Sequence, residues 1–127
     1  MNASQIEVAV LGATGYTAYE LIRILVRHPG VKIVAATSRS EAGKPISAIH
    51  PALTGLIDLR VESLGPEEVG KRADCVFCCL PHCASAEQTP AILAAGAKVV
   101  DFSADYRLHN AGVFSRWYSA EHPDPDR

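Results

Sequence analysis

The sequence has no cluster of basic residues. Its 127 residues include 12 Lys and Arg against 14 Asp and Glu, and the formal net charge is −2 with histidine neutral. Proteins that bind the phosphate backbone of nucleic acids usually carry a basic patch or stripe. We therefore do not expect DNA or RNA as a partner.

Long apolar runs are also absent. No stretch approaches the roughly 20 apolar residues that span a bilayer, and no basic segment followed by an apolar core marks a secretory signal at the N-terminus. We expect a cytoplasmic protein that does not contact a membrane. The apolar fraction of 48% is sufficient for one globular domain, residues 1–127.

The four cysteines lack a second ligand pair at zinc-ribbon spacing. Cys75, Cys78 and Cys79 lie in an apolar run typical of a strand, and Cys83 follows it. Cys78 and Cys79 would point to opposite faces of that strand, which disfavours shared zinc ligation. Disulfides are disfavoured by the same geometry and by the cytoplasmic setting. We interpret all four as free thiols that act as small buried hydrophobic groups, and we expect no metal site.

What the sequence does contain is a glycine turn between a strand and a helix. Apolar residues 6–11 run into Gly12-Ala13-Thr14-Gly15-Tyr16-Thr17-Ala18, and an amphipathic helical pattern follows. In the spacing G-x-x-G-x-x-A, Ala18 stands where the dinucleotide fingerprint often has its third glycine, a position that accepts alanine. Glycine permits the tight turn and the close approach of a ligand, and the helix dipole favours an anion. We expect Gly12, Thr14, Gly15, Tyr16 and Thr17 to bind a diphosphate; an ordinary strand–turn–helix corner is the alternative.

The end of the second predicted strand, residues 31–37, lacks a carboxylate. Sites for NAD usually have Asp or Glu here to hold the ribose 2′-hydroxyl. This chain has Thr37-Ser38-Arg39-Ser40 instead. A guanidinium flanked by hydroxyls suits a 2′-phosphate, so Ser38 and Arg39 predict NADP rather than NAD. A solvated loop arginine is the alternative interpretation.

Strand and helix patterns alternate along the chain. The predicted strands are 6–11, 31–37, 59–64, 73–80 and 97–102, a long loop covers 41–58, and helical segments begin at Pro66 and Ser85. This alternation predicts an α/β fold: a Rossmann-like, doubly wound parallel sheet in three layers, α/β/α, with strand order 3-2-1-4-5. A packed tail with Phe114, Trp117 and Tyr118 follows, and residues 119–127 are expected to fray.

Polar residues follow the fourth and fifth predicted strands at their carboxyl ends, where ligands bind in such sheets. We expect Leu80, Pro81, His82 and Ser103 to contact the cofactor, and Asp105 and Arg107 to contact the substrate. A plain loop histidine is the alternative for His82. The alternative for Arg107 is a structural ion pair with Asp101 or Asp105.

Several separate motifs together resemble one enzyme family. They are Gly12-Ala13-Thr14-Gly15-Tyr16-Thr17, Thr37-Ser38-Arg39-Ser40 with Gly43-Lys44-Pro45, Leu80-Pro81-His82, Asp101-Phe102-Ser103-Ala104-Asp105-Tyr106-Arg107-Leu108, and Trp117-Tyr118 with Glu121-His122-Pro123. The chain resembles the N-acetyl-gamma-glutamyl-phosphate reductases, which are related to aspartate-semialdehyde dehydrogenases. The resemblance implies an NADPH-dependent step of arginine biosynthesis. A cysteine thiolate attacks an acyl phosphate, phosphate leaves, and hydride reduces the thioester to a semialdehyde, with a histidine as acid and base.

The chain departs from that family in three respects. The family's nucleophile lies in an Asn-Pro-Gly-Cys type of motif beyond the Glu-His-Pro segment, and its catalytic histidine lies further on, so no catalytic residue is assigned here. Ala18-Tyr19 stands where the family commonly has Gly-Ala, and Cys83 where glycine is common. The resemblance thus implies an NADP-binding domain without the catalytic α+β domain, inactive alone and with an exposed apolar face. The full-length enzyme is expected to be a homo-oligomer that acts on a small molecule.

Three alternatives remain open from the sequence. One is the related reductase of lysine biosynthesis, which acts on N-acetyl-aminoadipyl phosphate, and another is an enzyme of the aspartate-semialdehyde dehydrogenase type. The third belongs to a different class: a non-catalytic module that senses NADP.

Overall fold

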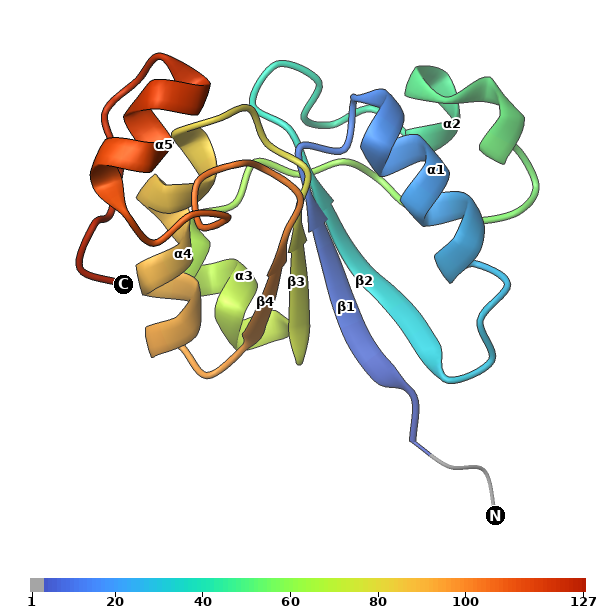
Figure 1. The fold of residues 1–127 in the computed structure, drawn as a ribbon. Helices are drawn as coiled ribbons and strands as arrows, with labels where there is room; N and C mark the ends of the chain where they lie inside the picture. Colours follow the sequence, from blue (N-terminus) through green and yellow to red (C-terminus); the bar gives the residue numbers. More distant parts are fainter. Residues whose placement is uncertain (1–3) are drawn as a thin grey trace.

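The computed structural model describes residues 4–127 and has a parallel sheet between two helical layers (Figure 1). In chain order the elements are β1 (Ile6–Leu11), α1 (Tyr16–Leu25), β2 (Val31–Thr37), α2 (Ile46–Ile49), the 3-10 helix η1 (Pro51–Leu53), α3 (Pro66–Arg72), β3 (Cys75–Cys78), α4 (Ala84–Ala94), β4 (Lys98–Asp101) and α5 (Ala111–Tyr118). The strands lie in the order β2-β1-β3-β4 and all pair in parallel. The predicted Rossmann-like α/β architecture is confirmed.

Side chains alternate across the sheet and form two cores. On one face, Val8 of β1 packs in a cluster with Ile22 of α1, and both are buried. On the other face, the neighbouring Ala9 belongs to a cluster with Val69 of α3 and Ile92 of α4. Because both faces of β1 are buried, its sequence is apolar almost throughout.

The predicted strand over 59–64 is wrong: within residues 4–127 the sheet has four strands, not the expected five. Its backbone pairing is divided between two partners: Leu59 O accepts from Ile46 N at 2.7 Å, whereas Glu62 N donates to Ala36 O at 3.0 Å. Only Glu62 forms an isolated parallel bridge to β2. The segment lies beside β2, as the predicted strand order requires, but too few of its residues are in register for a strand.

The segment 41–58, predicted as a loop, contains α2 and η1. Ile46 and Leu53 are fully buried in the cluster that also holds α1. Pro51 begins η1, where its missing N–H costs no hydrogen bond. The segment therefore contributes two short helical turns that pack in the same core as α1.

The tail with Phe114 forms a further helix, α5, which the sequence interpretation did not identify. Its N-cap is Asn110, whose Oδ1 accepts from Val113 N at 3.0 Å. Phe114 is buried, while Trp117 is 73% exposed. The packed tail is therefore anchored through one aromatic side chain and leaves another in solvent.

Contacts also extend into residues 119–127, for which fraying is expected. His122 is nearly buried and its Nε2 donates to Leu108 O at 2.8 Å. Asp124 Oδ2 accepts from the hydroxyl of Tyr106 at 3.0 Å. These contacts hold the end of the chain against the loop after β4, which differs from the loose tail that its polar, proline-rich sequence suggests.

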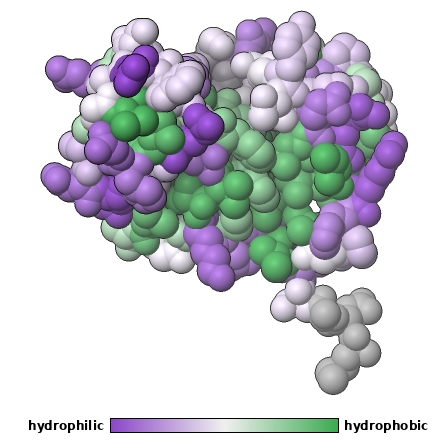
Figure 2. Space-filling model, in the orientation of Figure 1, coloured by the Kyte–Doolittle hydropathy of each residue, from purple (hydrophilic) through white to green (hydrophobic). Residues whose placement is uncertain are grey.

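The edge strand β4 presents apolar side chains to solvent. Val100 is 41% exposed, and Phe102 just after the strand is 51% exposed and stacks on Phe77 with 6.3 Å between ring centroids. Figure 2 shows hydrophobic surface along the middle of the molecule in this view.

The bend after β1 depends on the absence of a side chain at residue 12. Gly12 has φ +73°, and a Cβ built on it would lie 2.4 Å from the carbonyl oxygen of Cys79. That carbonyl belongs to the chain leaving β3, the neighbour of β1. The turn therefore fits against the next strand only with glycine.

We predict that Gly12→Ala lowers the free energy of unfolding by about 3 kcal/mol or more, because positive φ and overpacking both oppose it. Gly55→Ala is the matched control, since Gly55 has φ +79° with open space around it, and should lose only about 1–2 kcal/mol. Urea unfolding of both variants measures the difference. Equal losses of unfolding free energy in the two variants would show that the close approach to the carbonyl of Cys79 adds no cost at residue 12.

The cysteines are free, and those of the β3 region are poorly ionised. Burial, followed by the negative charge of Asp101, raises the pKa of Cys78 to about 12 and that of Cys79 to about 11. Burial also raises the pKa of Cys75. Cys78 and Cys79 belong to opposite cores, which confirms that they face apart.

We predict slow alkylation of Cys78 and Cys79. With raised pKa values both thiols stay protonated at pH 8, so the thiolate fraction is on the order of 10⁻⁴ and 10⁻³. Iodoacetamide labelling at pH 8, read by peptide mass spectrometry, should be at least about a hundredfold slower than in the urea-unfolded chain. Labelling at the unfolded rate would contradict the burial of these thiols.

Candidate functional site

The turn from β1 into α1 leaves backbone donors free. Gly15 is the N-cap of α1, and no side chain caps this helix. Among residues 4–127, the amides of Thr14, Gly15, Tyr16 and Thr17 have no hydrogen-bond acceptor. A Cβ built on Gly15 would meet no atom within 4 Å. The turn therefore has both the open space and the N–H groups that an anion requires.

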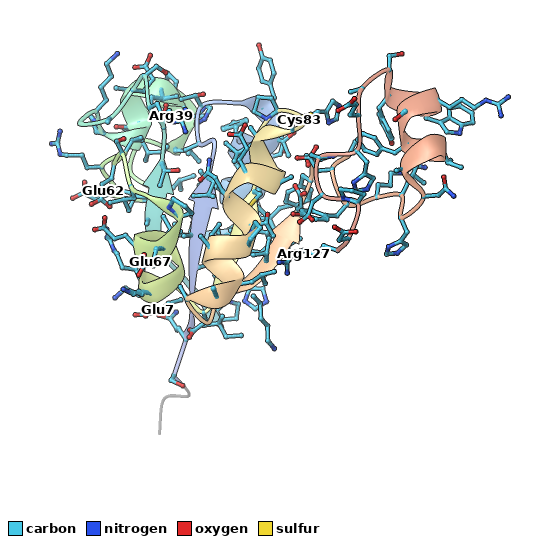
Figure 3. The ribbon with its side chains drawn as sticks, turned by 90° about the vertical axis from the view of Figure 1, so that its left-hand side faces the viewer. Glu7, Arg39, Glu62, Glu67, Cys83 and Arg127 are labelled. Atoms are coloured by element: carbon cyan, nitrogen blue, oxygen red, sulfur yellow. The ribbon has the colours of Figure 1, made fainter. Side chains whose placement is uncertain are left out.

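The end of β2 presents a free guanidinium beside two hydroxyls. Ser38 Oγ accepts from Glu41 N at 3.3 Å and lies 3.4 Å from Ser40 Oγ, so the bend is locally braced. The guanidinium of Arg39 is exposed and makes no hydrogen bond or ion pair with another described residue. Figure 3 shows Arg39 and Cys83 near the same end of the sheet, with Glu7 at the opposite end.

A cleft of about 780 Å³ lies at this carboxyl end of the sheet, a size typical of a ligand site. It brings together six of the predicted cofactor residues: Gly12, Thr14, Ser38, Arg39, Leu80 and Pro81. Nine further residues complete the lining, namely Thr37, Ser40, Ser63, Leu64, Gly65, Pro66, Ala84, Glu87 and Gln88.

Two groups among those nine differ in how far the sequence could identify them. Ser63 to Pro66 lie at or just beyond the carboxyl end of the segment 59–64 that was predicted as a strand, and such strand ends are where ligands are sought. Glu87 and Gln88 lie on α4, and no motif distinguishes them. Their place in the cleft follows from how α4 packs against the sheet.

The remaining predicted cofactor residues lie outside this lining. Gly15, Tyr16 and Thr17 are exposed at the start of α1, and the Tyr16 side chain is 92% exposed. His82 is exposed, and its Nδ1 accepts from Ala104 N at 3.2 Å. The Ser103 hydroxyl is used internally, donating to Asp101 Oδ2 at 2.9 Å. None of these contacts involves the cleft.

The two predicted substrate residues are placed differently from each other. Asp105 is fully buried, and its carboxylate oxygens already accept from Cys83 N and Ala86 N, so it cannot reach a substrate in this structure. Arg107 is exposed and its Nη1 donates to the Tyr118 hydroxyl at 2.7 Å. It pairs with neither Asp101 nor Asp105, so the structural ion pair considered for it is not formed.

His50 supports the glycine turn and was not identified from the sequence. Its Nε2 donates to Ala13 O at 2.6 Å, and its ring lies 5.2 Å from that of Tyr19. The histidine sits between α2 and η1, so only the fold of that segment places it beneath the turn.

Within residues 4–127 no group of three or more His, Cys, Asp or Glu side chains could hold a metal ion. Over the same range, no helix has the length and apolar character to span a bilayer.

Comparison with known proteins agrees with this geometry. Residues 7–120 match the family described as semialdehyde dehydrogenase, NAD binding domain. The chain is 47% identical over 127 residues to N-acetyl-gamma-glutamyl-phosphate reductase of Rhodopirellula baltica. The match covers 100% of this chain and 37% of the relative. The chain is also 48% identical over 122 residues to LysW-L-2-aminoadipate/LysW-L-glutamate phosphate reductase of Saccharolobus solfataricus, covering 96% and 35% of the two chains.

A solved structure of a semialdehyde dehydrogenase is also similar to this chain. Aspartate semialdehyde dehydrogenase of Candida albicans, crystallised with NADP, matches with a TM-score of 0.71 and 26% identity over 85% of this chain and 32% of that one. The present chain therefore spans about a third of the length of these relatives. By its sequence, its sheet and its cleft, the chain belongs to the semialdehyde dehydrogenase NAD-binding domain family.

Proposed function

We propose that this chain is the NADP-binding part of an acyl-phosphate reductase that converts N-acetyl-gamma-glutamyl phosphate to N-acetylglutamate semialdehyde and phosphate, a step of arginine biosynthesis. The observation that supports it most is the cleft in which the glycine turn and the Ser38-Arg39 pair meet. Both are suited to phosphate groups, and an NADP molecule carries phosphates at two separate places.

The described residues fit the cofactor. The free amides at the start of α1 would hold the diphosphate, with the positive end of the helix dipole adding attraction. Open space at Gly15 allows the backbone approach that this requires. When bound, NADPH supplies a hydride; the residues of this chain bind and orient it.

Preference for NADP over NAD rests on the charges around the end of β2. Arg39 is unpaired among the described residues, whereas the nearby carboxylate of Glu41 is paired with Lys44. Glu87 also lines the cleft, but from α4 and not from the end of β2. A 2′-phosphate would thus meet a free guanidinium at the position where NAD-binding sites have an acid.

The chain by itself is expected to bind NADPH without turning over substrate. None of its cysteines lies in the nucleophile motif of the family, and burial raises the pKa of Cys75, Cys78 and Cys79, so they are poor thiolate nucleophiles. The cytoplasmic location and the homo-oligomeric state of the full-length enzyme remain predictions from the sequence.

A second candidate substrate has specific support. The relative named for the LysW-linked phosphates is as similar to this chain as the N-acetylglutamyl enzyme, at 48% and 47% identity. Both candidates share acyl-phosphate reduction. Activity assays of the full-length protein with both acyl phosphates decide between them. A protein that binds NADPH but reduces no acyl phosphate, including the substrate of the aspartate-semialdehyde dehydrogenase type, would be the non-catalytic sensor.

We predict that Arg39→Ala weakens NADPH binding at least about tenfold, because a charge-assisted contact worth roughly 1.5–3 kcal/mol is lost. NADH affinity should stay within about twofold, since NADH has no 2′-phosphate. Arg27→Ala, with the same charge change beyond the other end of α1, should leave both affinities unchanged. Isothermal titration of the wild type and of both variants measures the two affinities. Equal weakening of NADPH and NADH binding by Arg39→Ala would contradict recognition of the 2′-phosphate by Arg39.

We predict that Gly15→Ala binds NADPH at least about tenfold more weakly while keeping its fold, because the added methyl occupies space that the diphosphate needs. The unfolding free energy should fall by no more than about 1 kcal/mol, the usual effect of alanine at an N-cap. Titration and urea unfolding test the two parts separately. Wild-type affinity in this variant would rule out diphosphate binding at the turn.

A further inference from the structure

The loops after β3 and after β4 are joined through one buried carboxylate. Asp105 Oδ1 accepts from Cys83 N at 2.6 Å, and Oδ2 accepts from Ala86 N at 2.9 Å. The side chain is fully buried. Hydrogen bonds to an ionised acceptor are the strong kind, and both oxygens are used.

This carboxylate caps α4 from a different part of the chain. The N-cap residue of α4 is Cys83, and its side chain makes no capping hydrogen bond. Asp105 instead accepts from the amide of the N-cap residue and from the amide of Ala86 in the first turn, and its carboxylate lies at the positive end of the helix dipole. The start of α4 is thus fixed by a residue 22 positions later than Cys83.

The backbone that Asp105 holds is in an unfavourable conformation. Cys83 has φ +70°, the left-handed region that non-glycine residues seldom adopt. Such a conformation persists only where surrounding contacts impose it. The bond from Cys83 N to Asp105 is a contact of that kind, so the bend before α4 depends on the carboxylate.

Asp105 is itself fixed to the end of β4. Its N–H donates to Ser103 Oγ at 3.1 Å, and Ser103 donates from its hydroxyl and from its amide to Asp101, the last residue of β4. The position of the carboxylate is therefore set by the sheet, and the bend before α4 is set by the carboxylate.

The segment held in this way forms one wall of the cleft. Leu80 and Pro81 precede the bend, Ala84 begins α4, and Glu87 and Gln88 follow in its next turn; all five line the cleft. The opposite wall comes from the end of β2. The width between these walls depends on where α4 begins.

We propose that Asp105 is a positioning residue for the cofactor cleft: without touching the cofactor, it fixes the start of α4 and the wall that faces Arg39. This rests on the proposed binding of NADPH to the cleft. Since the wall is common to both coenzymes, the loss of Asp105 should weaken NADPH and NADH alike, unlike the loss of Arg39.

The test uses Asp105→Asn, which keeps the shape but replaces one acceptor oxygen with an NH₂ group. We expect the dissociation constants for NADPH and NADH, measured by titration on the folded variant, to rise by the same factor of at least about ten. Hydrogen exchange at the amide that loses its acceptor, Cys83 or Ala86, should speed up at least about tenfold. Asp124→Asn, an equivalent change at the Tyr106 contact, should leave both affinities within about twofold.

Cys83→Gly provides a second test, including the case in which Asp105→Asn fails to fold. Glycine adopts the left-handed conformation without penalty, so Cys83→Gly/Asp105→Asn should fold and recover at least about threefold of the lost NADPH affinity. Wild-type affinity in a folded Asp105→Asn variant would overturn the positioning role while leaving NADPH binding intact. Failure of the wild-type chain to bind NADPH would overturn both proposals.

Discussion

The contact between the bend at Gly12 and the carbonyl of Cys79 sets the geometry of this domain. It allows β1 to turn sharply beside β3, so that α1 begins directly above the carboxyl end of the sheet. A side chain at residue 12 would separate the two strands at this point. The free amides of α1, the end of β2 and the start of α4 therefore converge on one edge of the sheet, where the cleft lies.

The cleft has walls of different character. Within the described part of the chain, the guanidinium of Arg39 on the β2 side and the N–H groups of the α1 turn have no partner, and both favour phosphate. The α4 side has no positive charge and is held by the buried carboxylate of Asp105. The groups that attract a ligand thus lie on exposed residues, whereas the shape of the cleft is fixed by a buried carboxylate.

The parts of the fold that depend on local pattern were predictable from the sequence. The glycine turn, the apolar runs of β1 and β2 and the arginine after β2 each carry their signal within a few residues. The segment 59–64 was predicted incorrectly because its pairing is divided between residue 46 and β2, which no local pattern shows. Likewise, Asp105 resembles a ligand at a strand end, and only its contacts with Cys83 and Ala86, about 20 residues away, give it a structural role.

The most direct test of this account is amide NMR of the chain titrated with NADPH. The account predicts saturable shifts that begin with the amides of residues 14–17 and 38–40, and weaker binding of NADH at the same residues. No shifts in either group at millimolar NADPH, or tighter binding of NADH, would contradict the account.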